Sequence, residues 1–97
     1  MIASVSPEAD RELTDGALFY SREGNAEVAS AFIAEYERVL ELLCAHPGLG
    51  ALWRSDRRRI PVRKFPYSIV YYIRGGEIRI FALAHHRRKP GYWASRK

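Results

Sequence analysis

Apolar residues recur at three- and four-residue steps through the first half of the chain, which is typical of amphipathic helices. The first run follows Ser6, a good capping residue, and Pro7, whose missing N–H costs nothing in a first helical turn. This run continues to about Arg22. A second run begins after Asn25, another capping residue, and ends before Pro47. The pattern therefore predicts two consecutive helices joined by a short turn.

The second half of the chain contains β-branched and aromatic runs, which are typical of strands. Runs at 67–73 and 77–84 flank a Gly-Gly pair, which is a strong hairpin signal. A run at 58–65 is predicted to be an edge strand, because Pro61 has no N–H for a central ladder. Together with a short opening strand, the order is β-α-α-β-β-β. We predict one α+β domain spanning 1–97, with the helical hairpin on one face of a small antiparallel sheet and the other face partly open.

Strand periodicity also predicts which side chains share a face of the sheet. In the first run of the hairpin, one face carries Tyr67, Ile69, Tyr71 and Ile73, and the other carries Ser68, Val70 and Tyr72. In the second run, strict alternation gives one face with Ile78, Ile80, Ala82 and Ala84, and another with Arg79, Phe81, Leu83 and His85. We therefore expect His85 to lie on the face opposite Ile78 and Ile80.

Charge is distributed unevenly along the chain. Residues 1–50 carry three Arg and nine acidic residues, or −6, and residues 51–97 carry thirteen Arg and Lys and two acidic residues, or +11. The two values sum to the net charge of +5. A basic half of this kind attracts a polyanion or an acidic protein, although a solvated charged surface has the same composition.

Several classes of protein are disfavoured by the sequence. Cys44 is the single cysteine, so no internal disulfide forms, and we expect a buried thiol in a reducing compartment. No signal peptide or membrane-spanning run is visible, so the expected location is the cytoplasm. His85 and His86 are neighbours on a strand and point to opposite faces, which disfavours a metal site. We expect no metal and no cofactor.

The remaining candidate chemistry is basic and aromatic, since paired carboxylates for acid–base catalysis are missing. Such a set can act on RNA, whose own 2′-hydroxyl is the nucleophile, or it can neutralise phosphates or bind an acidic peptide. The final Tyr and Trp can also pack as a C-terminal clasp on the fold. The set comprises Arg54, Arg57, Arg58, Arg59, Arg63, Lys64, Arg79, Arg87, Arg88, Lys89, Tyr92 and Trp93.

Three stretches, "LLCAHPGLG", "FPYSIVYYI" and "GGEIRIFALAHHRRKPGYW", together with the order of elements, resemble the RelE/ParE superfamily of bacterial and archaeal toxins. The resemblance covers essentially the whole chain. It implies the small cytoplasmic toxin of a type II toxin–antitoxin system, which inhibits growth and is neutralised by an antitoxin whose C-terminal segment wraps around it.

The superfamily has two mechanisms. RelE-like members cut mRNA on the ribosome, whereas ParE-like members poison DNA gyrase and lack the catalytic set. Ser68 stands where the nucleases carry an Arg, so the resemblance favours a ParE-like, non-enzymatic gyrase inhibitor. The alternatives are an mRNA endonuclease and a non-toxic relative that only binds its partner. Candidate nuclease residues are Arg63, Lys64, His85, His86, Arg88 and Tyr92. Candidate residues for binding the target or the antitoxin are Arg58, Arg59, Arg63, Lys64, Arg79, Arg87, Arg88, Lys89, Tyr92 and Trp93.

Overall fold

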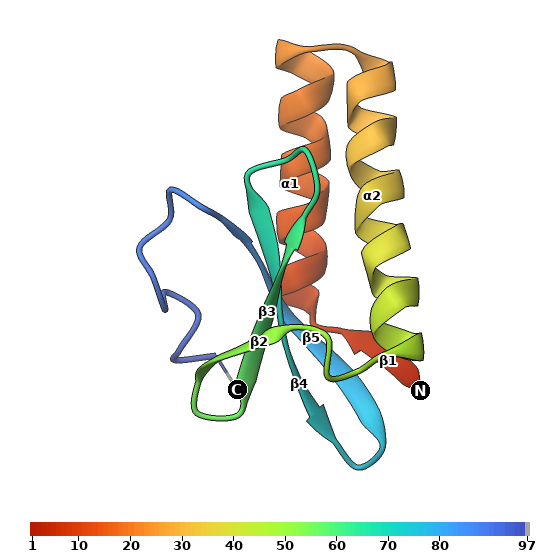
Figure 1. Ribbon diagram of the computed structural model, residues 1–97. Coiled ribbons are helices and arrows are strands. Elements are labelled where there is room, and N and C mark those ends of the chain that lie inside the picture. Colours follow the sequence, from red (N-terminus) through yellow and green to blue (C-terminus); the bar gives the residue numbers. More distant parts are fainter. Residues whose placement is uncertain (97) are drawn as a thin grey trace.

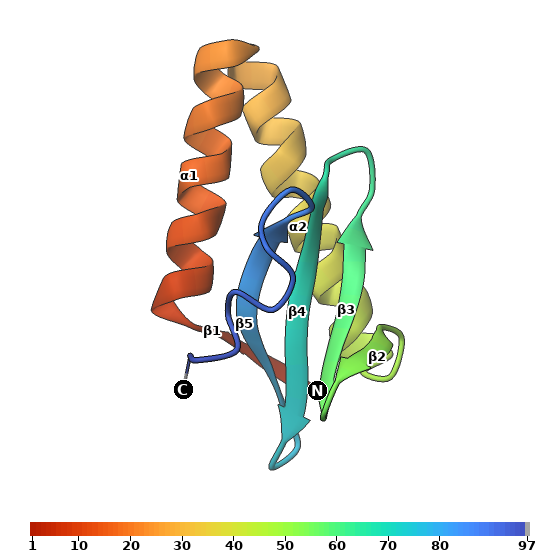
Figure 2. The ribbon, with the colours of Figure 1, turned by 90° about the vertical axis from the view of Figure 1, so that its left-hand side faces the viewer.

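The computed structural model describes residues 1–96 and has two helices on one side of a five-stranded sheet (Figure 1). The C-terminal tail, residues 86–96, loops over the opposite side of the sheet, in front of β5 and β4 (Figure 2). The predicted α+β fold is therefore confirmed. The elements are β1 (Ile2–Val5), α1 (Pro7–Glu23), α2 (Ala26–Ala45), β2 (Ala51–Arg54), β3 (Arg57–Val62), β4 (Tyr67–Arg74) and β5 (Glu77–His85).

Both helices begin at the predicted caps. The Ser6 hydroxyl accepts a hydrogen bond from the backbone N–H of Ala9 at 3.1 Å, and Asn25 Oδ1 accepts one from Val28 at 2.9 Å. These bonds satisfy N–H groups that the first turn of a helix leaves without a partner. The second helix ends at Ala45, before the predicted terminator.

The strand order is β1-β5-β4-β3-β2. Two details differ from the sequence-based prediction: β2 is an additional strand, and β1 pairs with β5 in parallel, so the sheet is mixed. The edge strands are β1 and β2, so the prediction that residues 58–65 form an edge strand is wrong where β2 pairs with residues 57–59 of β3. Pro61 lies beyond the part of β3 that pairs with β2, and it pairs only with Ser68 of β4. The missing N–H of Pro61 therefore removes no hydrogen bond to β2.

A β-bulge in β5 overturns the predicted alternation of that strand. Val70 pairs with Ala82 and Tyr71 pairs with Ile80, so Phe81 is an extra residue. Because a bulge shifts the side-chain register by one, the predicted faces of residues 82–85 are wrong. His85 pairs with Tyr67 and shares its face, with ring centroids 5.0 Å apart.

The bulge places apolar side chains on both faces of β5. Leu83 packs with Ile78 and Ile80 in the core beneath the helices, whose α2 side is formed by Phe32, Tyr36, Val39 and Leu43. On the opposite face a second cluster contains Val70, Phe81, Ala82 and Trp93, with Trp53, Tyr72, Ala84 and Tyr92 packed against it. The outer face is thus covered in part by the tail. Burying an apolar face in this way removes it from water, which is the main stabilising term in folding.

Tyr71 of β4 bonds the backbone of the segment after α2 at two points. Tyr71 Oη donates to the carbonyl of Pro47 at 2.8 Å and accepts from the N–H of Gly50 at 2.8 Å. A Cβ at position 50 would lie 2.7 Å from the Tyr71 ring and hydroxyl, so only glycine fits this close approach. The "HPGLG" stretch therefore packs against β4 through its backbone.

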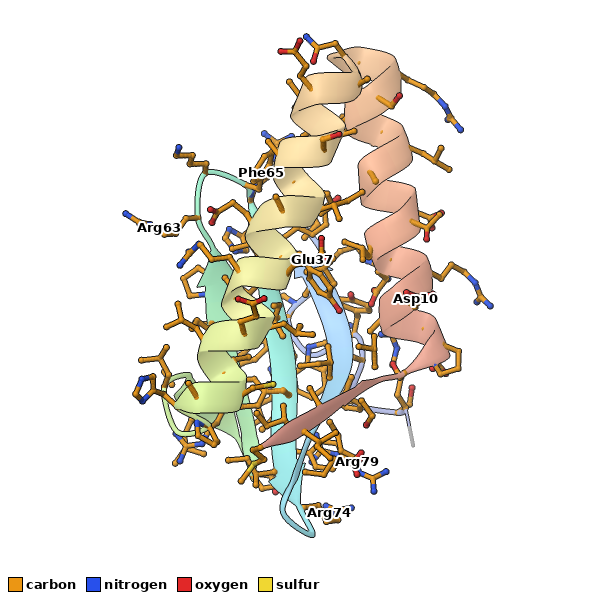
Figure 3. All side chains as sticks on the ribbon, turned by 90° about the vertical axis from the view of Figure 1, so that its right-hand side faces the viewer. Asp10, Glu37, Arg63, Phe65, Arg74 and Arg79 are labelled. Carbon is orange, nitrogen blue, oxygen red and sulfur yellow. The ribbon has the colours of Figure 1, made fainter. Side chains whose placement is uncertain are left out.

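Charged side chains are segregated between the layers (Figure 3). Asp10 and Glu37 lie on the helices, whereas Arg63, Arg74 and Arg79 lie at the two ends of the sheet. The dipolar charge predicted from the sequence thus becomes an acidic helical layer and a basic sheet layer. Within residues 1–96, no helix is long and apolar enough to cross a membrane.

Candidate functional site

A cavity of about 130 Å³ lies between the tail and the outer face of the sheet. Its floor is formed by Ser68 and Val70 of β4 and by Ala84 of β5. Trp53 of β2 and Arg59 of β3 line one side, and His85 at the end of β5 lines the rest together with tail residues 86 and 88–93. The sheet forms the base of the cavity, and the tail contributes two of its charged side chains, Arg88 and Lys89. We call this cavity the tail pocket.

Ser68 and His86 form a polar pair in the tail pocket. Ser68 is 8% exposed, and its Oγ lies 3.0 Å from His86 Nε2. The backbone N–H of His86 donates to the carbonyl of Pro66 at 2.8 Å, which fixes the start of the tail against the β3–β4 turn. A small hydroxyl, held by an imidazole, therefore stands at the position where the resemblance places an Arg in the nucleases.

Two cations of the tail pocket are stacked on aromatic rings. The Arg59 guanidinium lies 4.4 Å from the centroid of Trp53, and that of Arg88 lies 3.8 Å from the centroid of Tyr92. Lys89 also lines the cavity. In the described part of the chain, neither guanidinium nor Lys89 forms an ion pair, and no acidic side chain lines the cavity. Stacking on a ring holds each cation in place without neutralising it, so the pocket favours an anionic group.

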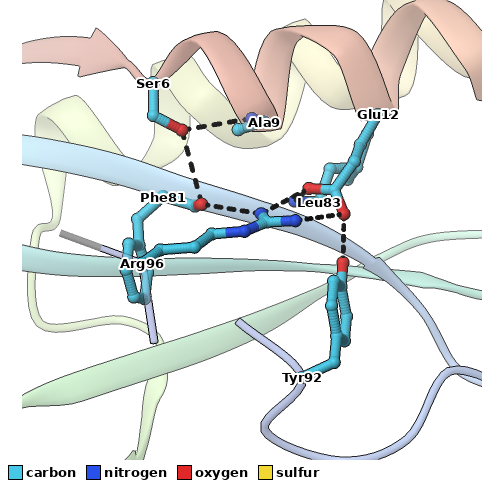
Figure 4. A network of polar contacts seen from close by, with 7 residues as sticks. All are labelled: Ser6, Ala9, Glu12, Phe81, Leu83, Tyr92 and Arg96. Atoms are coloured by element: carbon cyan, nitrogen blue, oxygen red, sulfur yellow. Dashed lines mark hydrogen bonds and ion pairs between the residues drawn. The ribbon is translucent and has the colours of Figure 1, made fainter. Parts of the chain in front are cut away.

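The end of the tail is a clasp. Trp93 is 2% exposed and packs against Phe81 and Trp53, with ring centroids 5.1 and 5.3 Å apart. The Tyr92 hydroxyl donates to the carboxylate of Glu12 on α1, and Arg96 bonds the same carboxylate at 2.9 Å (Figure 4). Trp93, predicted as a binding residue, is therefore buried in the apolar cluster on the outer face of the sheet.

Burial and the Glu12 carboxylate raise the pKa of Tyr92 well above its ordinary value of 10. This hydroxyl is thus held in its protonated form, which can donate a proton but cannot accept one as a general base. Burial, with the nearby charges of Arg87 and His86, lowers the pKa of His85 below its usual 6.5. Of the proton-transfer groups proposed for nuclease chemistry, Tyr92 is therefore committed to Glu12, whereas His85 and His86 both line the tail pocket.

The structure brings seven of the predicted site residues to one cavity and leaves the others apart. The seven are Arg59, His85, His86, Arg88, Lys89, Tyr92 and Trp93. Arg58 instead donates to the carbonyls of Gly48 and Gly50 at 3.2 and 2.8 Å, which stabilises the loop before β2. Arg63 and Lys64 lie exposed in the β3–β4 turn, and Arg79 lies 3.8 Å from Glu77 near the other end of β5. Arg87 is exposed on the tail.

Sequence reasoning missed Trp53, Glu12 and Arg96. Trp53 was missed because β2 has only four residues, too few to show a period. Glu12 lies three residues after the buried Ala9 and four before the buried Gly16, on the side of α1 that faces the sheet. A charged residue at a core-facing helical position was the available signal, because such groups are rarely buried without a partner.

A helical hairpin on one face of a five-stranded mixed sheet is the fold that the resemblance to the RelE/ParE superfamily predicts. The sequence matches the family of the ParE toxin of type II toxin–antitoxin system, parDE, over residues 3–90, and the chain belongs to this family. A solved structure of the chromosomal ParDE toxin–antitoxin system from P. aeruginosa contains a similar fold, with a TM-score of 0.78 at 19% sequence identity. The similarity covers 88% of this chain and 95% of that one. No curated protein matches the sequence.

Proposed function

We propose that this ParE-family chain stops growth by binding and inhibiting DNA gyrase, without cleaving RNA. The observation that carries this proposal is the tail pocket itself, which presents Arg59, Arg88 and Lys89 without ion-pair partners among the described residues. Preorganised cations provide a site for an acidic surface, and they increase the rate of association with one.

The same geometry argues against cleavage of mRNA. By the resemblance, Ser68 stands where the nucleases carry an Arg, and the Tyr92 hydroxyl is bound to Glu12. Removal of one group that stabilises a developing charge commonly costs roughly two to three orders of magnitude in rate. A chain that lacks this group and also has its tyrosine sequestered is better suited to binding than to catalysis.

We further propose that a cognate antitoxin neutralises the chain, as expected for a type II system. The exposed apolar side chains of α1 support this proposal, since Leu18 and Phe19 are 46% and 54% exposed. A hollow beside them is lined by Gly16, Phe19 and Tyr67, and it continues to His85 and Arg88 at the tail. A partner segment that folds on binding could cover this hollow and the start of the tail together.

Induction of the chain without an antitoxin tests the proposal in cells. We expect growth arrest and a DNA-damage response, because the target of the chain would be an enzyme that acts on DNA. We expect intact mRNA, because the chain would not cleave it. Primer extension on cellular mRNA is the matched measurement. Cuts within translated codons, without DNA damage, would instead make the chain an mRNA endonuclease. Unchanged growth would make it a relative that only binds its partner.

A further inference from the structure

Glu12 connects three segments that are distant in the sequence (Figure 4). Its carboxylate accepts from the backbone N–H of Leu83 in β5 at 3.1 Å and from the Tyr92 hydroxyl. It also accepts from both terminal nitrogens of Arg96, at 2.9 and 3.2 Å. Hydrogen bonds to an ionised group are stronger than those between neutral groups. A two-point Arg–carboxylate contact also fixes the orientation of the two side chains relative to each other. One side chain of α1 thus binds the strand and both ends of the clasp.

The tail has little else to hold it. In backbone–backbone hydrogen bonds, the N–H groups of described residues 87–96 bond only to carbonyls of nearby residues, between His85 and Trp93. These backbone hydrogen bonds form local turns within the tail. The last backbone bond from the tail to another segment is that of His86 to Pro66. Beyond this point the tail is attached to the fold by side chains: by Trp93 in the outer cluster and by the Glu12 network. Attachment by few groups makes a segment prone to local opening.

The network reaches the tail pocket through two successive contacts. Glu12 fixes the Tyr92 hydroxyl, and the ring of Tyr92 supports the Arg88 guanidinium at 3.8 Å. Arg96 adds a second point of attachment, because it also donates to the carbonyl of Phe81 at 3.2 Å, in the bulge of β5. The position of Arg88 at the rim of the pocket therefore depends on a carboxylate that lies outside the pocket.

We propose that Glu12 is a positioning residue for target binding, which holds the tail closed so that Arg88 and Lys89 face the target. This inference rests on the proposed function in one respect, namely that the tail pocket is the contact surface. It assigns to α1 a role in activity that does not require the helix to touch the target. If the network is broken, the tail samples many conformations. Binding to the target must then order the tail again, and the free energy that this requires lowers the affinity.

The test compares Glu12→Gln with the control Glu23→Gln, which removes the same charge from an exposed position of the same helix. Hydrogen exchange of the C-terminal peptide reports tail opening, and growth arrest and gyrase inhibition report activity. We expect Glu12→Gln to raise the exchange rate of residues 88–96 roughly tenfold or more, since it removes charge-assisted hydrogen bonds. The inhibitory concentration should rise by a similar factor, with native circular dichroism. Glu23→Gln should behave as the wild type in both measurements.

A second variant, Tyr92→Phe, controls for misfolding of Glu12→Gln. It removes only the hydroxyl that bonds Glu12 and keeps the ring that stacks on Arg88. It should show a smaller change of the same sign in both measurements. Unchanged exchange in Glu12→Gln would overturn the proposal, and so would faster exchange with wild-type growth arrest. If the wild-type chain arrests growth but spares gyrase, the proposed function fails alone, and growth arrest by the variants still decides the role of Glu12. A wild-type chain that does not arrest growth would overturn both.

Discussion

Ser68 Oγ and His86 Nε2 lie 3.0 Å apart, so a residue of β4 and the first residue after the end of β5 are joined inside the tail pocket. The bond orients the imidazole and satisfies a hydroxyl that is 8% exposed. It also explains how the fold accommodates a small residue at a position where the resemblance places a nuclease Arg. Ser68 thus contributes to the shape of the pocket.

Replacing Ser68 by Ala should lower the free energy of unfolding by about 1 kcal/mol, because a mostly buried hydrogen bond is lost. Denaturant unfolding measures this change, and Ser21→Ala, on the exposed surface of α1, is the control. We expect the control to remain within about 0.5 kcal/mol of the wild type. Equal stabilities for the two variants would show that the Ser68–His86 bond contributes nothing in solution.

A matched pair of glycines tests the packing of the "HPGLG" segment. Gly50→Ala should destabilise the fold by about 1–3 kcal/mol, since its Cβ would lie 2.7 Å from the Tyr71 ring in a buried position. Gly48→Ala meets nothing within 4 Å and should change stability little. Thermal melts of both variants are the measurement. A Gly50→Ala protein as stable as Gly48→Ala would contradict the close approach of this backbone to β4.

Two buried tyrosines should respond oppositely to the loss of their hydroxyl groups. Tyr71 Oη has two backbone partners, so Tyr71→Phe strands the buried N–H of Gly50 and should cost about 1–3 kcal/mol. Tyr36 Oη is buried and has no hydrogen-bond partner among the described residues. Tyr36→Phe should therefore leave stability unchanged or raise it by up to about 1 kcal/mol. Urea unfolding of the two variants checks the contrast. A destabilised Tyr36→Phe protein would indicate a partner for that hydroxyl.

The buried phenols also predict loss of stability in alkali. Burial raises the pKa of Tyr36 from 10 to about 12, and burial and Glu12 raise that of Tyr92. A folded-state pKa above the unfolded value means that the native state keeps its proton longer. The resulting stability is fully present below pH 10 and is lost as the pH rises toward 12. Tyrosinate absorbance should therefore rise together with unfolding, and Tyr36→Phe should reduce the loss. Independent titration of all tyrosines near pH 10 in a folded protein would contradict this.

The helices could be predicted from the sequence because their signals are local. Ser6 and Asn25 cap the helices that begin beside them, and the Gly-Gly pair marks the β4–β5 hairpin within a few residues. The bulge at Phe81 could not be predicted in this way, because it depends on how β5 pairs with β4 rather than on its own alternation. One extra residue therefore moved Leu83 and His85 to the opposite face from the one expected.

The candidate site was predictable in composition but not in arrangement. The basic and aromatic tail was evident in the sequence, and seven of the predicted site residues, five of them in the tail, do meet at one cavity. The contact that fixes the tail links Glu12 to Tyr92 and Arg96 across 80 and 84 residues, and no local pattern reports such a distance. Only the tertiary fold brings an acidic residue of the first helix into contact with Tyr92 and Arg96 of the tail.

The most direct measurement of the central claim is gyrase supercoiling activity in the presence of the purified chain. We compare the wild type with Arg88→Gln/Lys89→Gln in the tail and with Arg11→Gln/Arg22→Gln, which removes two positive charges from the exposed surface of α1. The account predicts that the wild type and the α1 variant inhibit gyrase. The inhibitory potency of the tail variant should fall roughly tenfold or more, because its charge complementarity to an acidic surface is removed. Gyrase that remains fully active at saturating wild-type chain would contradict it.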